Sequence, residues 1–237
     1  MIPDHLYPLT QKLSGSKLCI FDFDGTLVNL ESLNFYCICK VTMKFVHKKP
    51  DLEFYRQSMA GREAREGFRN VLSHLVPDRV DEFDFDTLRT EYHKYKRQAL
   101  QEPPETFSRV VPGAQDFLQI LKKRSYHLAI ASASTREFME KLMKYYKLYD
   151  NFEFIIAARD VPESKPSPLP YNTVISHFHL PVDEIIAFED SKNGIRSAKS
   201  AGLYTVGIHN PGWNDSFVWD MADITVSDYR ECIDALT

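Results

Sequence analysis

Cysteine is scarce in this sequence of 237 residues, and the few cysteines form no pattern of bridges or ligands. Four cysteines are too few for a disulfide framework in a chain of this length. Cys37 and Cys39 are separated by one residue, which is the spacing of neither a zinc ribbon nor a redox dithiol, and no second pair follows them. We therefore expect a reducing compartment and free thiols at all four positions, Cys19, Cys37, Cys39 and Cys232.

The sequence also lacks long hydrophobic runs and any excess of positive charge. No stretch approaches the roughly 18 uncharged apolar residues of a transmembrane helix, and the N-terminal residues have neither the basic start nor the apolar run of a signal peptide. The 29 lysines and arginines against 33 aspartates and glutamates give a net charge of −4, which argues against nucleic acid or a membrane as a partner. We expect a cytoplasmic protein, by default a monomer.

Five short apolar runs recur along the chain, at residues 18–21, 128–131, 154–157, 185–188 and 205–208. Continuous apolar runs of this length are typical of strands that are buried on both faces. A helical pattern precedes each of the last four runs, at residues 113–123, 136–147, 169–179 and 193–201. Strands that alternate with helices predict an α/β fold with a Rossmann-like parallel sheet.

The interval after the first run breaks this alternation. No buried strand run appears between Glu31 and Ser108, where the sequence is charged, rich in aromatic residues and helical in character. A simple strand–helix–strand connection needs far fewer residues. We expect an inserted α-helical cap at residues 29–108, and an α/β core made of residues 1–28 and 109–237.

Polar residues follow directly after several of the predicted strands. They are Asp22 and Asp24 after the first strand, Ser132 after the second, Lys165 across a short loop after the third, and Glu189 and Asp190 after the fourth. In open parallel sheets, ligands bind beyond the carboxyl ends of the strands. Carboxylates, a hydroxyl and a lysine at one edge of the sheet indicate a metal-assisted reaction at a phosphate group.

These residues belong to four motifs that resemble, in order, the motifs of the haloacid dehalogenase superfamily. The motifs are Asp22-Phe23-Asp24-Gly25-Thr26-Leu27, Ser132, Lys165-Pro166, and Glu189-Asp190-Ser191 with Gly194-Ile195. The chain is similar, from residue 17 to residue 237, to the phosphatase and β-phosphoglucomutase-like branch, which carries a helical cap after the first motif. A single Asp-x-Asp would be a weak signal, but four ordered motifs at strand ends are a specific one.

The resemblance implies a role for each residue of the first motif. Asp22 would attack phosphorus and form an aspartyl-phosphate, which divides one displacement into two easier ones. Asp24 would protonate the leaving oxygen and then deprotonate the attacking water. Gly25 would let the chain turn sharply, and Thr26 would hold Asp24 by a hydrogen bond. The alternative for the two carboxylates is an Asx-turn that ends the strand.

The resemblance also implies a magnesium ion, which favours oxygen ligands in octahedral geometry. The implied protein ligands are Asp22, the backbone carbonyl of Asp24, and Asp190. Glu189 is a further candidate ligand, directly or through water; alternatively, it forms an ion pair with Lys165 or Lys192.

The phosphate group would be bound by residues of the second and third motifs. Ser132 would donate to a phosphate oxygen, together with the amide of Ala133 at the start of the next helix. Lys165 would place its positive charge on the phosphate.

The cap should determine substrate specificity, because a lid closes over the substrate and excludes water. The segment Gly61–Arg65 resembles a cap loop that contacts substrate, so Arg62 or Arg65 could bind a second anion. Alternatively, these arginines and Arg69 form a solvated charged face of a helix. The turn motif Asn210–Trp213 could pack against the site or only against the sheet.

The resemblance implies a Mg²⁺-dependent phosphomonoester hydrolase for a small phosphorylated metabolite, such as a sugar phosphate or phosphoglycolate. One alternative is a phosphomutase of the β-phosphoglucomutase type, but Asn29, Leu30 and Asn34 replace the Asp-Thr and the histidine of that pattern, which favours a hydrolase. A non-catalytic regulatory module is the other alternative. The presence of all the motif residues argues against it.

Overall fold

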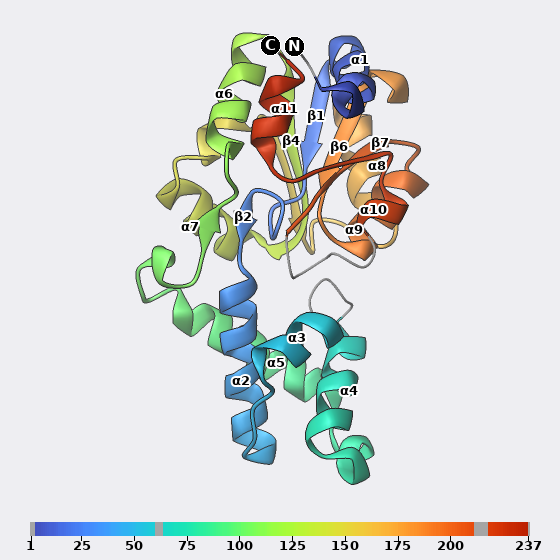
Figure 1. Ribbon diagram of the computed structural model, residues 1–237. Coiled ribbons are helices and arrows are strands. Elements are labelled where there is room, and N and C mark those ends of the chain that lie inside the picture. Colours follow the sequence, from blue (N-terminus) through green and yellow to red (C-terminus); the bar gives the residue numbers. More distant parts are fainter. Residues whose placement is uncertain (1–2, 60–63, 211–217, 237) are drawn as a thin grey trace. The chain divides into compact units, whose positions relative to one another are not determined.

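The computed structural model describes residues 3–59, 64–210 and 218–236, and the chain forms two compact units. Met1–Asn29 and Val110–Thr237 form one unit, called here the core unit, and Leu30–Arg109 forms the other, called the insert unit. Figure 1 shows a sheet flanked by helices in the core unit. The two short strands β2 (Val28–Asn29) and β3 (Arg109–Val110), where the chain passes from one unit to the other, pair as a separate sheet.

The core unit contains a six-stranded sheet in the order β5-β4-β1-β6-β7-β8, and every pair of neighbours is parallel. The strands are β1 (Leu18–Phe21), β4 (His127–Thr135), β5 (Phe154–Ala158), β6 (Ile185–Glu189), β7 (Tyr204–Ile208) and β8 (Ile224–Val226). The predicted α/β class and all five predicted strands are confirmed. The sixth strand, β8, was not predicted, because it is short, lies at the sheet edge and has no continuous apolar run in the sequence.

Helices cover both faces of this sheet. They are α1 (Tyr7–Gly15), α6 (Ala114–Lys123), α7 (Arg136–Tyr145), α8 (Leu169–Phe178), α9 (Lys192–Ser200), α10 (Val218–Met221) and α11 (Tyr229–Asp234). Figure 1 shows α6 and α11 on one face, and α8 and α9 on the other. The four predicted helices of the core are confirmed to within two residues at each end. None of the helices in the described part of the chain is long and apolar enough to cross a membrane.

Alternate residues of β1 pack on opposite faces of the sheet, as the pleat requires. Leu18 and Ile20 belong to a buried cluster with Tyr171 and Val174 of α8. Phe21 faces the other side, where its ring stacks on that of Phe188 at a centroid distance of 4.7 Å.

An aromatic cluster fills the space between the sheet and the helices α6 and α11. Phe117 of α6 lies 6.4 Å from Phe21, 5.5 Å from Phe188 and 5.3 Å from Tyr229 of α11, between ring centroids. All four side chains are fully buried. Because Phe21 precedes Asp22 and Phe188 precedes Glu189, this cluster fixes the two strand ends that carry candidate site residues.

The described residues of the insert unit form α2 (Glu31–Val46), α3 (Leu52–Ser58), α4 (Ala64–Leu75) and α5 (Phe85–Ala99). Buried apolar side chains lie on one face of α2, among them Leu33, Cys37 and Val41. Asp84 caps α5, because its carboxylate accepts hydrogen bonds from the amides of Asp86 and Thr87. The Tyr92 hydroxyl of α5 donates to Asn34 Oδ1 of α2 over 2.7 Å.

We expect Phe117→Ala to destabilise the protein by about 3–5 kcal/mol, because the change opens a cavity inside the aromatic cluster. The measurement is unfolding by urea, followed by fluorescence and circular dichroism. Tyr145→Ala is the control, since Tyr145 is 49% exposed on α7, and its cost should stay below about 1 kcal/mol. Equal losses of stability in the two variants would contradict the packing described for Phe117.

Candidate active site

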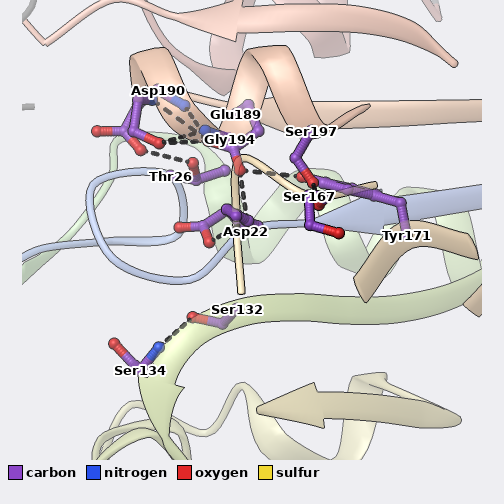
Figure 2. Close-up of polar contacts among 12 residues, drawn as sticks. Asp22, Thr26, Ser132, Ser134, Ser167, Tyr171, Glu189, Asp190, Gly194 and Ser197 are labelled. Atoms are coloured by element: carbon purple, nitrogen blue, oxygen red, sulfur yellow. Dashed lines mark hydrogen bonds and ion pairs between the residues drawn. The ribbon is translucent and has the colours of Figure 1, made fainter. Parts of the chain in front are cut away.

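The strand register brings polar residues at or just beyond the carboxyl ends of β1, β4 and β6 to one edge of the sheet. Phe21 pairs with Ile130 of β4 and with Phe188 of β6. Asp22 and Glu189, each one residue further along, therefore lie level with each other, and Ser132 lies two residues past Ile130. Figure 2 shows Asp22, Glu189 and Asp190 close together, with Ser132 on the neighbouring strand. The expected edge of the sheet is confirmed.

The loop after β1 turns back on itself within a few residues. Gly25 has a φ of +86°, a backbone conformation that residues other than glycine rarely adopt. Its amide donates to the carbonyl of Val28 over 2.8 Å, and Asp24 forms a bridge with the same residue. A Cβ atom on Gly25 would lie 1.9 Å from Asp190 Oδ2. The glycine therefore permits both the turn and the close approach of the Asp190 carboxylate.

Lys165 is buried at the centre of the site, although a lysine before a proline in a loop would ordinarily be solvated. Its side chain is 4% exposed, and Nζ donates to Asp22 Oδ1 over 2.6 Å and also to Glu189 Oε1. The ammonium group lies 5.0 Å from the centre of the Tyr171 ring. The lysine thus links the carboxylates at the carboxyl ends of two neighbouring strands, β1 and β6.

Glu189 uses both carboxylate oxygens for contacts within the protein. Oε1 accepts from Lys165 and from the Tyr171 hydroxyl over 3.0 Å. Oε2 accepts from the amide of Asp190 over 3.1 Å, and from the amide and hydroxyl of Ser191 over 3.2 Å each. Of the two lysines proposed as ion-pair partners, Lys165 is the one in contact. A carboxylate has about four acceptor positions, and Glu189 accepts from five donors.

Gly194 makes room for this carboxylate at the start of α9. A Cβ atom there would lie 1.8 Å from Glu189 Oε1, a separation that no packing can accommodate. The Gly194 amide donates to the Ser191 hydroxyl over 3.0 Å, which caps α9. The glycine in the fourth motif thus has a steric reason as well as a place in the pattern.

Asp190 is held by neutral donors from two other loops. The Thr26 hydroxyl donates to Oδ1 over 3.0 Å, and the Asn210 side-chain amide donates to Oδ2 over 3.3 Å. The expectation that Thr26 holds Asp24 is wrong. A hydroxyl has one proton, and the Thr26 hydroxyl points to Asp190, which the turn at Gly25 brings alongside.

The site carries more negative charge than its partners neutralise. Burial, and then the carboxylates of Glu189 and Asp22, raise the pKa of Asp190 well above its usual range. Burial raises the pKa of Asp22 to about 7 even though Lys165 opposes the shift. For Lys165, burial lowers the pKa, but the attraction of Asp22 and Glu189 outweighs it, and the net shift is upward. Each of these shifts favours the protonated form, so the site favours added positive charge.

This donor set fits a hard divalent cation. One oxygen from each of Asp22, Glu189 and Asp190 lies within 4.8 Å of the other two, and all three residues are buried. If ionised, three carboxylates against the ammonium of Lys165 leave two negative charges. A doubly charged cation with oxygen ligands would balance them.

Ser132 is buried near the end of β4, and its hydroxyl accepts from the Ser134 amide over 3.1 Å. The expectation that Ala133 begins the next helix is wrong, because β4 runs on to Thr135 and α7 begins at Arg136. The register of β4 against β5 shifts between Ala131 and Thr135. This irregularity extends the strand past the apolar run from which its end was predicted.

Of the two arginines expected to contact substrate, Arg65 lies within the described residues and Arg62 does not. Arg65 is exposed on α4, and its guanidinium carbon lies 5.6 Å from the centre of the Phe85 ring. Arg69 lies over the same ring at 5.7 Å. Both contacts agree with the alternative interpretation, a charged helix face. Arg62 lies outside the described residues, as does Trp213 of the turn motif.

Sequence reasoning missed two residues that support the site, Tyr171 and Ser197, and left open whether Asn210 packs against the site or only against the sheet; Asn210 contacts the site. Tyr171 donates to Glu189, and the Ser197 hydroxyl donates to the carbonyl of Ser167, in the loop that carries Lys165 (Figure 2). Asn210 donates to Asp190. Asn210 had a usable signal, since it comes two residues after the run that forms β7. Tyr171 and Ser197 had none, because each occupies an ordinary buried position of a helix.

Comparison with known proteins agrees with a site that handles phosphate groups. A model of the haloacid dehalogenase-like hydrolase family matches residues 19–208. A validoxylamine A 7′-phosphate phosphatase of Streptomyces hygroscopicus subsp. limoneus is 28% identical over 215 residues, which cover 91% of this chain and 95% of that protein. A phosphorylated carbohydrates phosphatase of Thermotoga maritima is 29% identical over 189 residues, 78% of this chain and 81% of that protein.

A crystal structure from Haemophilus somnus, described as a predicted phosphoglycolate phosphatase, shares the fold with a TM-score of 0.79. At 21% identity, the match covers 94% of this chain and 99% of that chain. The family match extends from β1 to β7 and includes every motif residue from Asp22 to Asp190. The chain therefore belongs to the haloacid dehalogenase-like hydrolase family.

Proposed function

We propose that this protein, a phosphatase of the family, hydrolyses a small phosphorylated metabolite with the help of Mg²⁺, through an aspartyl-phosphate on Asp22. The observation that carries the proposal is the buried cluster of Asp22, Glu189 and Asp190, in which Lys165 contacts Asp22 and Glu189. Such a cluster has no structural advantage of its own, because burying like charges is costly. It suits a reaction that brings a cation and a phosphate group to the same place.

Asp22 is the proposed nucleophile. A carboxylate oxygen of Asp22 forms a bond to phosphorus while the bond from phosphorus to the ester oxygen breaks, which leaves an aspartyl-phosphate. The ammonium of Lys165, 2.6 Å from Asp22 Oδ1, is in place to bind an oxygen of the transferring group. The backbone amide of Asp22 donates to the carbonyl of Phe188 over 3.0 Å, so this strand end is anchored.

Asp24 is the proposed general acid and base. It is half-buried, two residues after Asp22, and its backbone is held against Val28. Its carboxyl group gives a proton to the leaving oxygen as the ester bond breaks. The resulting carboxylate then takes a proton from water, whose oxygen attacks phosphorus and releases phosphate from Asp22.

We propose that Asp22, Asp190 and the backbone carbonyl of Asp24 hold the Mg²⁺ ion. When bound, the ion would neutralise charge on the phosphoryl oxygens. Glu189 is better suited to hold Lys165 than to bind the metal, because both of its oxygens already accept hydrogen bonds. The phosphate would also meet the Ser132 hydroxyl and the Ala133 amide at the end of β4.

We propose that the insert unit acts as the cap and sets the substrate. The relatives described above are named for phosphate esters of a validoxylamine and of carbohydrates, which supports a polyhydroxylated phosphate ester here. Asn34, at the position where the mutase pattern has histidine, accepts a hydrogen bond from Tyr92 and cannot exchange a proton near neutral pH. This supports a hydrolase over a phosphomutase.

A panel of phosphorylated metabolites, assayed with Mg²⁺ for released phosphate, tests this function. Asp22→Asn should abolish release from every substrate that the wild type hydrolyses, because the amide cannot form the aspartyl-phosphate. Asp24→Asn should slow turnover by about 10²–10⁴-fold, the usual contribution of proton transfer. Steady turnover by Asp22→Asn would rule out the covalent route, and unchanged turnover by Asp24→Asn would remove that residue from the acid–base role.

Removal of metal ions with a chelator should abolish activity, and Mg²⁺ should restore it while Ca²⁺ does not, because Ca²⁺ accepts more and looser ligands. Mg²⁺ should also stabilise the protein by about 2.7 kcal/mol at 100 times its dissociation constant, or roughly 5–10 °C in Tm. Thermal unfolding with and without each ion measures this second effect. Full activity of the metal-free protein would overturn the proposed site.

Two neighbouring carboxylates should respond differently to removal of charge. Glu189→Gln should lower kcat/KM by about 10²-fold or more, through misplacement of Lys165, and should leave the Mg²⁺ dissociation constant within about threefold. Asp190→Asn should weaken Mg²⁺ binding by at least about 100-fold. Calorimetric titration with Mg²⁺ compares them. If Glu189→Gln weakens binding as much as Asp190→Asn, Glu189 is a metal ligand.

A further inference from the structure

Asn210 takes no part in the chemistry proposed above, yet it is buried next to the site. It follows β7, and only 7% of its surface is exposed. Buried amides are costly unless they are hydrogen-bonded. Its contacts therefore show what it does.

The side-chain amide of Asn210 joins two loops of the site. Nδ2 donates to the backbone carbonyl of Gly25 over 2.8 Å and to Asp190 Oδ2 over 3.3 Å. Both neighbours are acceptors, so the nitrogen of the amide must face them; an oxygen in that place would meet two other oxygens. The orientation of the amide is therefore determined by its surroundings.

Asn210 and Thr26 together hold the two oxygens of Asp190. Thr26 donates to Oδ1 and Asn210 to Oδ2, from loops that follow two different strands. The carboxylate of Asp190 is therefore fixed in its plane. Gly25, whose missing side chain admits this carboxylate, is bound by the same Asn210 amide.

The donors to Asp190 differ in charge from the donors to its neighbour. Glu189 is paired with the ammonium of Lys165, whereas Thr26 and Asn210, which both donate to Asp190, are neutral. Neutral donors orient the carboxyl group of Asp190 without adding a positive charge. The direction of Asp190 is therefore set in advance, while the demand of the site for a cation remains.

We propose that Asn210 is a positioning residue for the metal site, which orients Asp190 and fixes the Gly25 turn to it. This inference rests on the proposed function, because it requires that Asp190 binds Mg²⁺. Asn210 itself binds neither the metal nor the substrate. Its loss is felt in metal affinity and not in the chemical step.

The test measures Mg²⁺ binding to the complete protein by calorimetric titration, and the Mg²⁺ dependence of activity on a hydrolysed phosphate ester. Asn210→Ala should raise the Mg²⁺ dissociation constant about 10–100-fold, the range typical of residues that orient metal ligands. At saturating Mg²⁺, kcat and the KM for the ester should return to within about threefold of wild type. A loss of kcat that Mg²⁺ does not restore would overturn the positioning role.

Asn151→Ala is the matched control for the loss of a buried amide. Asn151 is 9% exposed and donates from Nδ2 to the carbonyl of Leu148 over 3.0 Å, in a turn that carries no site residue. This variant should bind Mg²⁺ like the wild type. If Asn210→Ala also does, Asn210 has only a structural role and the inference is wrong.

Two further variants guard against a folding defect in Asn210→Ala. Asn210→Leu has a similar shape without the donor, and should weaken Mg²⁺ binding to the same extent. Thr26→Val should weaken Mg²⁺ binding as well. Thr26→Ser keeps the hydroxyl and should bind Mg²⁺ like the wild type. If the wild type binds no Mg²⁺, the metal step of the proposed function fails first. If the wild type binds Mg²⁺ and the Asn210 variants bind it equally well, this inference alone fails.

Discussion

Repulsion between buried carboxylates is the constraint around which the core unit is arranged. Parallel register places Asp22 and Glu189 at adjacent strand ends, with Asp190 next in sequence, and burial deprives all three of water. Lys165 places a positive charge against Asp22 and Glu189. A site with this charge imbalance persists only if the surrounding packing holds it together, which is common where catalysis and stability make opposite demands.

The helices on both faces of the sheet supply that packing. The stacked rings of Phe21 and Phe188 lie one residue before Asp22 and Glu189, and helices α6 and α11 close over them. On the other face, Tyr171 of α8 reaches Glu189 with its hydroxyl, and Ser197 of α9 binds the loop of Lys165. The helices α8 and α9 thus cover the sheet and also hold polar groups of the site.

Glycine matters at two points of this arrangement for different reasons. Gly25 adopts a left-handed backbone conformation and admits Asp190, whereas Gly194 lies in a helix and leaves room for Glu189. The carboxylates approach the backbone at both places, where a side chain would displace them. The family's pattern of residues near the carboxylates is therefore a steric pattern as much as a chemical one.

The sequence by itself determined the fold class, the strands that carry the site, and the sheet edge where Asp22, Lys165, Glu189 and Asp190 meet, because apolar runs and the residues that end them are local signals. It did not determine the partners of these groups. The Thr26 hydroxyl donates to Asp190, and β4 continues through Ala133. The carboxylate of Glu189 accepts from five donors that belong to four residues. Those outcomes depend on the directions of side chains that are up to 185 positions apart, as with Asn210 and Gly25. Only tertiary packing decides such contacts, because hydrogen bonds are specific to a few tenths of an ångström and residue spacing along the chain carries no information at that scale.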